Sequence, residues 1–191
     1  MRERKLTRDE ALGEYLVYQI KLYEFLHMFQ INLDLMKHKY APENSLGHKT
    51  EDFFATTRVA LYGLFASLMD PQPHALNVFD VWVALYPEEE ARIRETWRAI
   101  EPHVQLMRDY RNDISFHANK DLRRYFRTRS AFQGNADVLV PAMQQFWDLA
   151  AYLIRNQSKA LPDFAREIEP ILRKVIAEED IEQAKGYFIV G

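Results

Sequence analysis

Residues 7–36, TRDEALGEYLVYQIKLYEFLHMFQINLDLM, decide the fold class of this chain. Thr7 and Glu10 have the spacing of a capping box, in which each side chain bonds the other residue's backbone, so a helix is predicted to begin there. Apolar side chains then recur mostly at steps of three and four residues, which is typical of one face of a long helix. They form two rows: Tyr15, Tyr18, Leu22, Phe25, Phe29, Leu33 and Met36, and beside them Leu12, Leu16, Ile20, Tyr23 and Leu26.

The helical period continues after each break in the chain, and no strand pattern longer than a few residues is present. Loops are predicted at 39–49, 70–74 and 130–137, where proline, glycine and short polar residues gather. We therefore expect residues 1–191 to form one all-α, bundle-like domain with a long N-terminal helix. The later helices are predicted to begin near Thr50, Asn77, Pro87, Pro102, Pro141 (within a first turn) and Pro162.

The composition excludes several classes of function. Hydrophobic residues make up 48% of the chain and charged residues 28%, as in ordinary globular proteins. The absence of cysteine excludes disulfides, thiolate zinc sites and thiol nucleophiles. With a net charge of −3, the chain needs a local basic patch to bind a nucleic acid. No signal-peptide pattern or membrane-spanning run is present, so a soluble cytoplasmic protein without a membrane partner is expected.

The segment RDYRNDISFHANK (108–120) contains the two residues best suited to catalysis, Arg111 and His117. On a regular helix they lie about 120° apart around the axis and about 9 Å apart along it. Their side chains can therefore meet in two ways: the helix ends near 115–117 and the imidazole folds back, or a second copy of the chain completes the site. Asp113, one turn before His117, is placed to orient the imidazole or raise its pKa.

Spacing alone does not identify this pair as functional. With 16 arginines and 6 histidines in 191 residues, about one and a half such pairs are expected by chance. A second pair, Arg98 and His103, is interrupted by Pro102 and is predicted to be divided between two helices. The residues around Arg111 distinguish the first pair from the second.

The run RNDISFH (111–117), with RDY before it, resembles the signature of the HEPN superfamily (higher eukaryotes and prokaryotes nucleotide-binding), and the abortive-infection branch is the most similar. The resemblance implies an up-and-down helical bundle and a metal-independent endoribonuclease without cofactors, of the toxin–antitoxin or antiviral-defence type. It also implies a homodimer whose paired motifs form one cleft, with an antitoxin protein as a possible partner. Arg111 matches the motif arginine, Asn112 the polar residue after it, and His117 the motif histidine.

The chemistry of metal-free RNA cleavage fits these residue types. Histidine titrates near neutrality, so His117 can accept or donate the proton of a 2′-hydroxyl. Arginine stays charged and directs two donors at phosphate oxygens, so Arg111 can hold the phosphate. Asn112 can position either group or bind the phosphate itself.

The run KDLRRYFRTR (120–129) is the densest basic stretch of the chain, with Asp121 as its one acid. It is predicted to follow an RNA backbone, with Tyr125 stacking on a base. The alternative is a solvated helix face with Tyr125 and Phe126 in the core, and the sequence leaves both interpretations open. The predicted RNA-binding residues are Lys120, Arg123, Arg124, Tyr125, Arg127 and Arg129.

A metal site is not expected. Glu24 and His27 have the Glu-x-x-His spacing of di-iron bundles, but such sites need a second pair and two more carboxylates. We interpret the pair as a helix surface with His27 partly buried. Three functions stay open: a HEPN-like endoribonuclease, a non-catalytic HEPN-like module that binds RNA or a partner protein, and a helical scaffold without a site.

Overall fold

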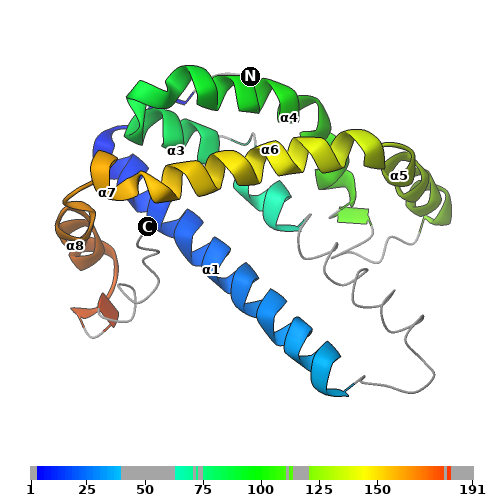
Figure 1. Cartoon of the computed structure of the whole chain (residues 1–191), viewed down its shortest axis with the longest axis horizontal. Helices are drawn as coiled ribbons and strands as arrows, with labels where there is room; N and C mark the ends of the chain where they lie inside the picture. The colour runs from blue at the N-terminus through cyan, green and yellow to red at the C-terminus, as the bar shows by residue number, and fades with distance from the viewer. Residues whose placement is uncertain are drawn as a thin grey trace.

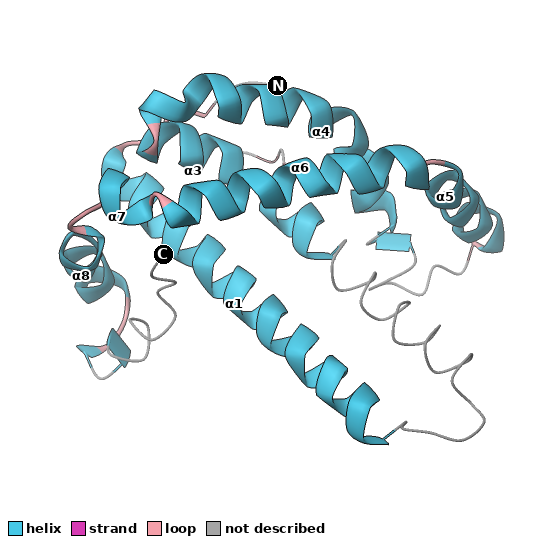
Figure 2. Ribbon diagram, viewed as in Figure 1, coloured by secondary structure: helices cyan, strands magenta, loops and turns pink. Residues whose placement is uncertain are grey.

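The computed structural model describes residues 4–39, 63–70, 72, 75–110, 112, 113, 121–178, 180 and 181. The regular secondary structure of these residues is helical throughout (Figure 2), so the predicted all-α class is confirmed for them. Residues 40–49 of the predicted loop and most of the helix predicted after it lie outside the described residues, but residues 63–68 are helical. No described helix is long and apolar enough to cross a membrane.

Helix α1 (Arg8–Lys39) is the long N-terminal helix that the sequence predicts, and its capping box is formed. Glu10 Oε2 accepts hydrogen bonds from the backbone N–H and the hydroxyl of Thr7, both at 2.8 Å, and Thr7 Oγ1 accepts from Glu10 N at 3.3 Å. The backbone and side-chain bonds from Thr7 lower the pKa of the Glu10 carboxyl. In Figure 1, the N-terminal part of α1 lies beside α3, and its C-terminal half extends away from the other labelled helices.

Shorter helices follow α1, and three of them begin where the sequence predicts, one of which starts at Pro87. Asn77 caps α3, because its Oδ1 accepts a hydrogen bond from Phe79 N at 3.1 Å. Asp163 directly precedes α8. The elements are α3 (Val78–Leu85), the 3₁₀ helix η1 (Pro87–Glu89), α4 (Glu90–Tyr110), α5 (Leu122–Gly134), α6 (Ala136–Arg155), α7 (Gln157–Ala160) and α8 (Phe164–Val175).

Helix α4 corrects the prediction that Pro102 opens a helix. It runs without a break from Glu90 through Pro102, so Arg98 and His103, which were expected on two helices, lie on one. Proline removes one backbone N–H donor and crowds the preceding turn. The buried face of α4 offsets that cost by placing four apolar side chains in the core. These are Ile93, Ile100, Val104 and Met107.

The loop predicted at 130–137 is also wrong in its extent. α5 continues to Gly134 and α6 begins at Ala136, which leaves only Asn135 between them. The backbone C=O of Asn135 accepts from Leu139 N at 2.9 Å, so the chain turns directly into the next helix. Pro141 consequently lies in the second turn of α6 and not in its first.

The buried apolar side chains of the described residues form one cluster, to which all the longer helices except α5 contribute. α1 packs against α3 and α8, whereas α4 packs against α3, α5 and α6. Edge-to-face aromatic contacts lie at its centre, including Phe65 on Phe146 with ring centroids 4.8 Å apart. α5 packs against α4 and α6 and lies at one end of the molecule in Figure 1. Its outer side is therefore not covered by the described helices.

A group of polar side chains lies inside this core. The Tyr15 hydroxyl donates to Gln157 Oε1 at 3.1 Å and lies 3.2 Å from the Tyr86 hydroxyl, while Gln19 Nε2 donates to the same Gln157 oxygen. The fully buried Tyr18 hydroxyl has no hydrogen-bond partner among the described residues. Burial raises the pKa of Tyr15, Tyr18 and Tyr86 above the ordinary tyrosine value, so all three hydroxyls stay protonated at neutral pH.

Candidate nucleic-acid interface

The predicted motif follows the C-terminal end of α4. Arg111, His117 and Lys120 lie outside the described residues, so their roles stay predictions. Asn112 is half-buried and Asp113 is buried, and the two residues form part of a π-helical turn. A π turn is wider than an α turn and is frequent at functional sites. Residues 112 and 113 therefore depart from the regular α-helix on which the expected separation of about 120° between Arg111 and His117 was based.

Asp113 connects the motif segment to α5. Its Oδ2 accepts hydrogen bonds from Arg124 Nε and from Thr128 Oγ1, both at 2.9 Å. The Asp113 side chain is 4% exposed and Thr128 is buried, whereas the Arg124 side chain is 55% exposed. Arg124 and Thr128 lie four residues apart and so share one face of α5. A buried carboxylate needs hydrogen-bond donors or a positive partner. These two bonds therefore hold this face of α5 against Asp113, which lies two positions after Arg111.

These partners differ from the one predicted for Asp113. The sequence suggests that this carboxylate orients His117 or raises the pKa of its imidazole, and that suggestion stays a prediction because His117 is not described. In the structure Asp113 holds Arg124, and this hydrogen bond raises the pKa of the guanidinium further above its ordinary value. Arg124 therefore anchors α5 through its Nε, and its exposed part remains next to the predicted RNA-binding residues.

Asp121 caps the N-terminus of α5. Its Oδ1 accepts from the backbone N–H groups of Arg123 at 2.9 Å and Arg124 at 3.2 Å, and its C=O accepts from Tyr125 N at 3.0 Å. Aspartate is among the preferred residues at this position. The one acid of the basic stretch is thus used at the helix end, and α5 itself contains no Asp or Glu.

The other arginines of α5 face solvent without acidic partners. Arg123, Arg127 and Arg129 are exposed, and no ion pair of these side chains is found within the described part of the chain. They concentrate positive charge at one end of a chain whose net charge is −3, which attracts polyanions such as a nucleic-acid backbone. Six arginines of other segments have carboxylate partners, namely Arg4, Arg8, Arg94, Arg108, Arg166 and Arg173, whereas none is found for Arg98 or Arg155 among the described residues.

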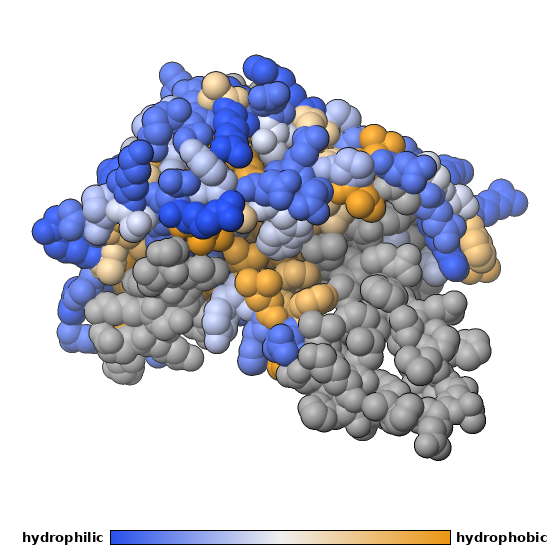
Figure 3. All heavy atoms as spheres, viewed as in Figure 1, coloured by the Kyte–Doolittle hydropathy of each residue, from blue (hydrophilic) through white to orange (hydrophobic). Residues whose placement is uncertain are grey.

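The two adjacent aromatic residues of α5, Tyr125 and Phe126, differ in exposure. Tyr125 is half-buried, while the neighbouring Phe126 is 57% exposed. Their ring centroids lie 5.4 Å apart with perpendicular planes. The alternative interpretation that both rings belong to the core is therefore wrong for Phe126, and stacking by Tyr125 stays a prediction. Figure 3 shows hydrophobic and hydrophilic side chains next to each other at the end of the molecule where α5 lies.

Thr128 and Phe126 are the residues of this site that sequence reasoning missed. Thr128 meets Asp113 across a helix boundary, and no local spacing rule connects two such positions. Phe126 stands beside Tyr125 in the sequence, and their adjacency gives no reason to prefer one ring. The helical spacing does give one indication for Phe126: it shares a face of the helix with Leu122 and not with Thr128.

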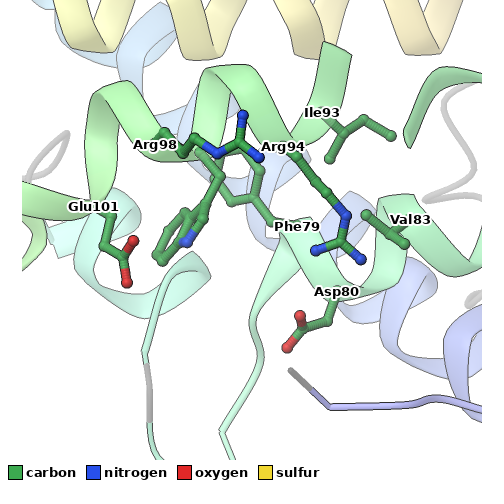
Figure 4. A pocket seen from close by; sticks show the side chains of 8 residues that line it. Phe79, Asp80, Val83, Ile93, Arg94, Arg98 and Glu101 are labelled. Carbon is green, nitrogen blue, oxygen red and sulfur yellow. The ribbon is translucent and has the colours of Figure 1, made fainter. Parts of the chain in front are cut away.

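A separate hollow lies between α3 and the N-terminal half of α4 (Figure 4), with a volume of about 220 Å³. Its charged lining consists of two arginines, Arg94 and Arg98, and two carboxylates, Asp80 and Glu101. Arg94 Nε also donates to Glu90 at 2.6 Å. The balance of opposite charges makes this hollow a poor site for a polyanion, and along the helix it lies about 20 Å from Asp113.

No group of three or more His, Asp or Glu side chains that could hold a metal is found within the described ranges. Glu24 and His27 both lie on the exposed surface of α1, so the prediction that His27 is partly buried is wrong. The His27 ring stacks on Tyr23 instead, with centroids 6.1 Å apart and planes 7° from parallel.

No family model, curated protein or solved structure matches this chain. The HEPN resemblance therefore rests on the motif segment alone. At the α4–α5 junction, Asp113 fixes a helix with three exposed arginines that have no ion-pair partner in the part of the chain that the structure describes.

Proposed function

We propose that the protein is a HEPN-like, metal-independent endoribonuclease of the toxin or antiviral-defence type, with the up-and-down bundle of that superfamily. One observation carries the proposal: α5 exposes three arginines that have no acidic partner among the described residues, and Asp113 holds this helix against the motif segment. An RNA strand bound along α5 runs next to the segment that contains Arg111 and His117.

Each residue has a distinct role in this proposal. Arg123, Arg127 and Arg129 bind phosphates of the strand, and Arg111 binds the phosphate to be cleaved. His117 takes the proton of the 2′-hydroxyl and returns a proton to the leaving oxygen. Asn112 positions one of these groups. Lys120, Arg124 and Tyr125 complete the RNA-binding surface.

The proposal includes a homodimer, because two copies of the motif in one cleft provide a second way for an arginine and a histidine to meet. It also includes neutralisation by an antitoxin protein, which is the expected partner of a nuclease that cleaves cellular RNA.

A second candidate is a non-catalytic HEPN-like module that binds RNA or a partner protein. It is favoured by the same basic helix, because binding along α5 needs neither Arg111 nor His117. The two candidates differ in one outcome, which is cleavage.

The test is cleavage of labelled RNA by the purified protein in a chelator. We expect cleavage by the wild type and a loss of about 100-fold or more in Arg111→Ala and in His117→Ala. Arg98→Ala and His103→Ala are matched controls, because they remove the same residue types from α4 outside the motif. Cleavage that survives in both motif variants contradicts the nuclease. RNA binding without cleavage, weakened by Arg123→Glu, supports the second candidate.

A further inference from the structure

Phe126 lies in the middle of the exposed face of α5, with arginines on both sides. At about 100° per residue, Arg129 is displaced by about 60° to one side of Phe126 and Arg123 by about 60° to the other. Leu122, one turn earlier, is 68% exposed and extends the apolar strip between them. Thr128, which bonds Asp113, lies on the roughly opposite side of the helix.

An exposed phenylalanine at this position requires an explanation. Among the Phe and Trp side chains whose exposure the structure describes, Phe126 is the one that is exposed. Its ring adds nothing to the folded core, and apolar surface in water gains stability only when a partner covers it. The Tyr125 ring, perpendicular to it at 5.4 Å, contacts it from the same helix and leaves it open to solvent.

The charge around Phe126 indicates what covers the ring. A nucleotide offers a flat apolar base and a negative phosphate, and this face offers a flat ring between guanidinium groups that have no carboxylate partner. In a duplex the base faces are hidden in the stack, whereas an unpaired strand leaves them free for aromatic side chains. The face is thus complementary to a single strand and not to a double helix.

We propose that Phe126 stacks on an unpaired base whose neighbouring phosphates bind Arg123, Arg127 and Arg129, so that α5 selects single-stranded over double-stranded RNA. This proposal rests on the RNA binding proposed above and names its substrate class. Phe126 takes the stacking role, and Tyr125 supports its ring from the side.

The test compares two probes. One is a fluorescein-labelled 2′-O-methyl oligouridine, whose blocked 2′-oxygens prevent cleavage; the other is the same strand paired with 2′-O-methyl oligoadenosine. We expect Phe126→Ala to weaken binding of the single strand by about 10-fold and to leave duplex binding within about two-fold. Phe126→Trp restores single-strand binding, and the matched control Val140→Ala, at an exposed apolar residue of α6, stays near wild type. Because both positions are exposed, a circular dichroism spectrum equal to wild type is expected for each variant.

Other results overturn the proposal. Equal losses for both probes, or full binding by Phe126→Ala, show that the ring does not read unpaired bases. A change in molecular mass by light scattering, with RNA affinity unchanged, assigns Phe126 to a protein interface instead. If the wild type cleaves RNA while Phe126→Ala binds normally, this inference fails and the nuclease stands. If the stacking effect is found without cleavage, the nuclease fails and this inference stands; absence of any RNA binding overturns both.

Discussion

Thr128 donates its hydroxyl to a buried carboxylate, and the burial of both groups sets the strength of that bond. The Asp113 side chain is 4% exposed and Thr128 is 8% exposed, so neither group has full access to water if the bond is lost. The second donor to Asp113, Arg124, is largely in solvent, where screening weakens its contribution. At the residue scale, Thr128 is therefore the better probe of how α5 is held.

We predict that Thr128→Val lowers the free energy of unfolding by about 2 kcal/mol, because the buried carboxylate loses a donor while side-chain volume is kept. Urea unfolding measures the change. Thr96→Val is the matched control: its hydroxyl bonds the Arg92 carbonyl on an exposed helix face, and a change within about 0.5 kcal/mol is expected there. Equal effects at the two positions contradict the anchoring role of Asp113.

The two buried tyrosines of α1 give a second prediction: removing their hydroxyls should change the free energy of unfolding in opposite directions. Tyr18→Phe removes a hydroxyl that has no partner in the described chain, so it should raise the free energy of unfolding by about 1 kcal/mol. Tyr15→Phe removes a hydroxyl bonded to Gln157 and close to Tyr86, and should lower it by about 1–2 kcal/mol. Urea unfolding of both variants decides; destabilisation by Tyr18→Phe contradicts this account of the core.

The same tyrosines predict loss of stability in alkali. Burial raises the pKa of Tyr15 and Tyr18 in the folded chain above the unfolded value, which is about 10. Their contribution is fully present below that pH and is lost as the pH rises further, because only the unfolded chain then releases the protons. Each tyrosine accounts for up to about 1.4 kcal/mol per pH unit. Unfolding followed above pH 10 should show a shallower decline in Tyr18→Phe, and an unchanged slope contradicts the prediction.

At the scale of elements, the sequence predicted helix beginnings well where a polar side chain bonds the first turn. The capping box at Thr7 and the cap at Asn77 are both formed, because these bonds involve residues only two or three apart. Two predictions from prolines are wrong. The sequence predicts Pro102 at a helix start and Pro141 in a first turn, but they lie inside α4 and α6. A proline costs a helix one hydrogen bond, and whether packing offsets that cost depends on neighbours that lie far away in the sequence.

The position of Pro102 gives a prediction for α4. Pro102→Ala restores a backbone donor in the middle of the helix and relieves crowding of the preceding turn, so the free energy of unfolding should rise by about 2 kcal/mol. Pro87→Ala serves as the control, because Pro87 begins a 3₁₀ helix where its fixed φ is favourable. That change should lower stability by about 0.4–1 kcal/mol. Destabilisation by Pro102→Ala, in thermal or urea unfolding, contradicts the reading of α4 as a helix that tolerates its proline.

At the scale of the whole molecule, charge is distributed unevenly. α5 has four arginines and no acid, while α1, α4 and α8 each have arginines paired with carboxylates. This concentration could be predicted from the sequence, because it needs only composition. The residues that hold α5 could not be predicted from the sequence, because Asp113 reaches Thr128 and Arg124 only after α5 packs on α4. The exposure of Phe126 also depends on packing, because it is set by the face of α5 that contacts the neighbouring helices.

The most direct test of the account is the salt dependence of binding to the single-stranded 2′-O-methyl oligouridine. Each phosphate neutralised contributes about −0.7 to the slope of log affinity against log salt concentration for a single strand. The triple variant Arg123→Ala, Arg127→Ala and Arg129→Ala should therefore have a slope smaller in magnitude by about 2. The control removes two exposed arginines outside α5, Arg98→Ala and Arg155→Ala, and should keep the wild-type slope. A triple variant with the wild-type slope would show that α5 does not bind the RNA backbone.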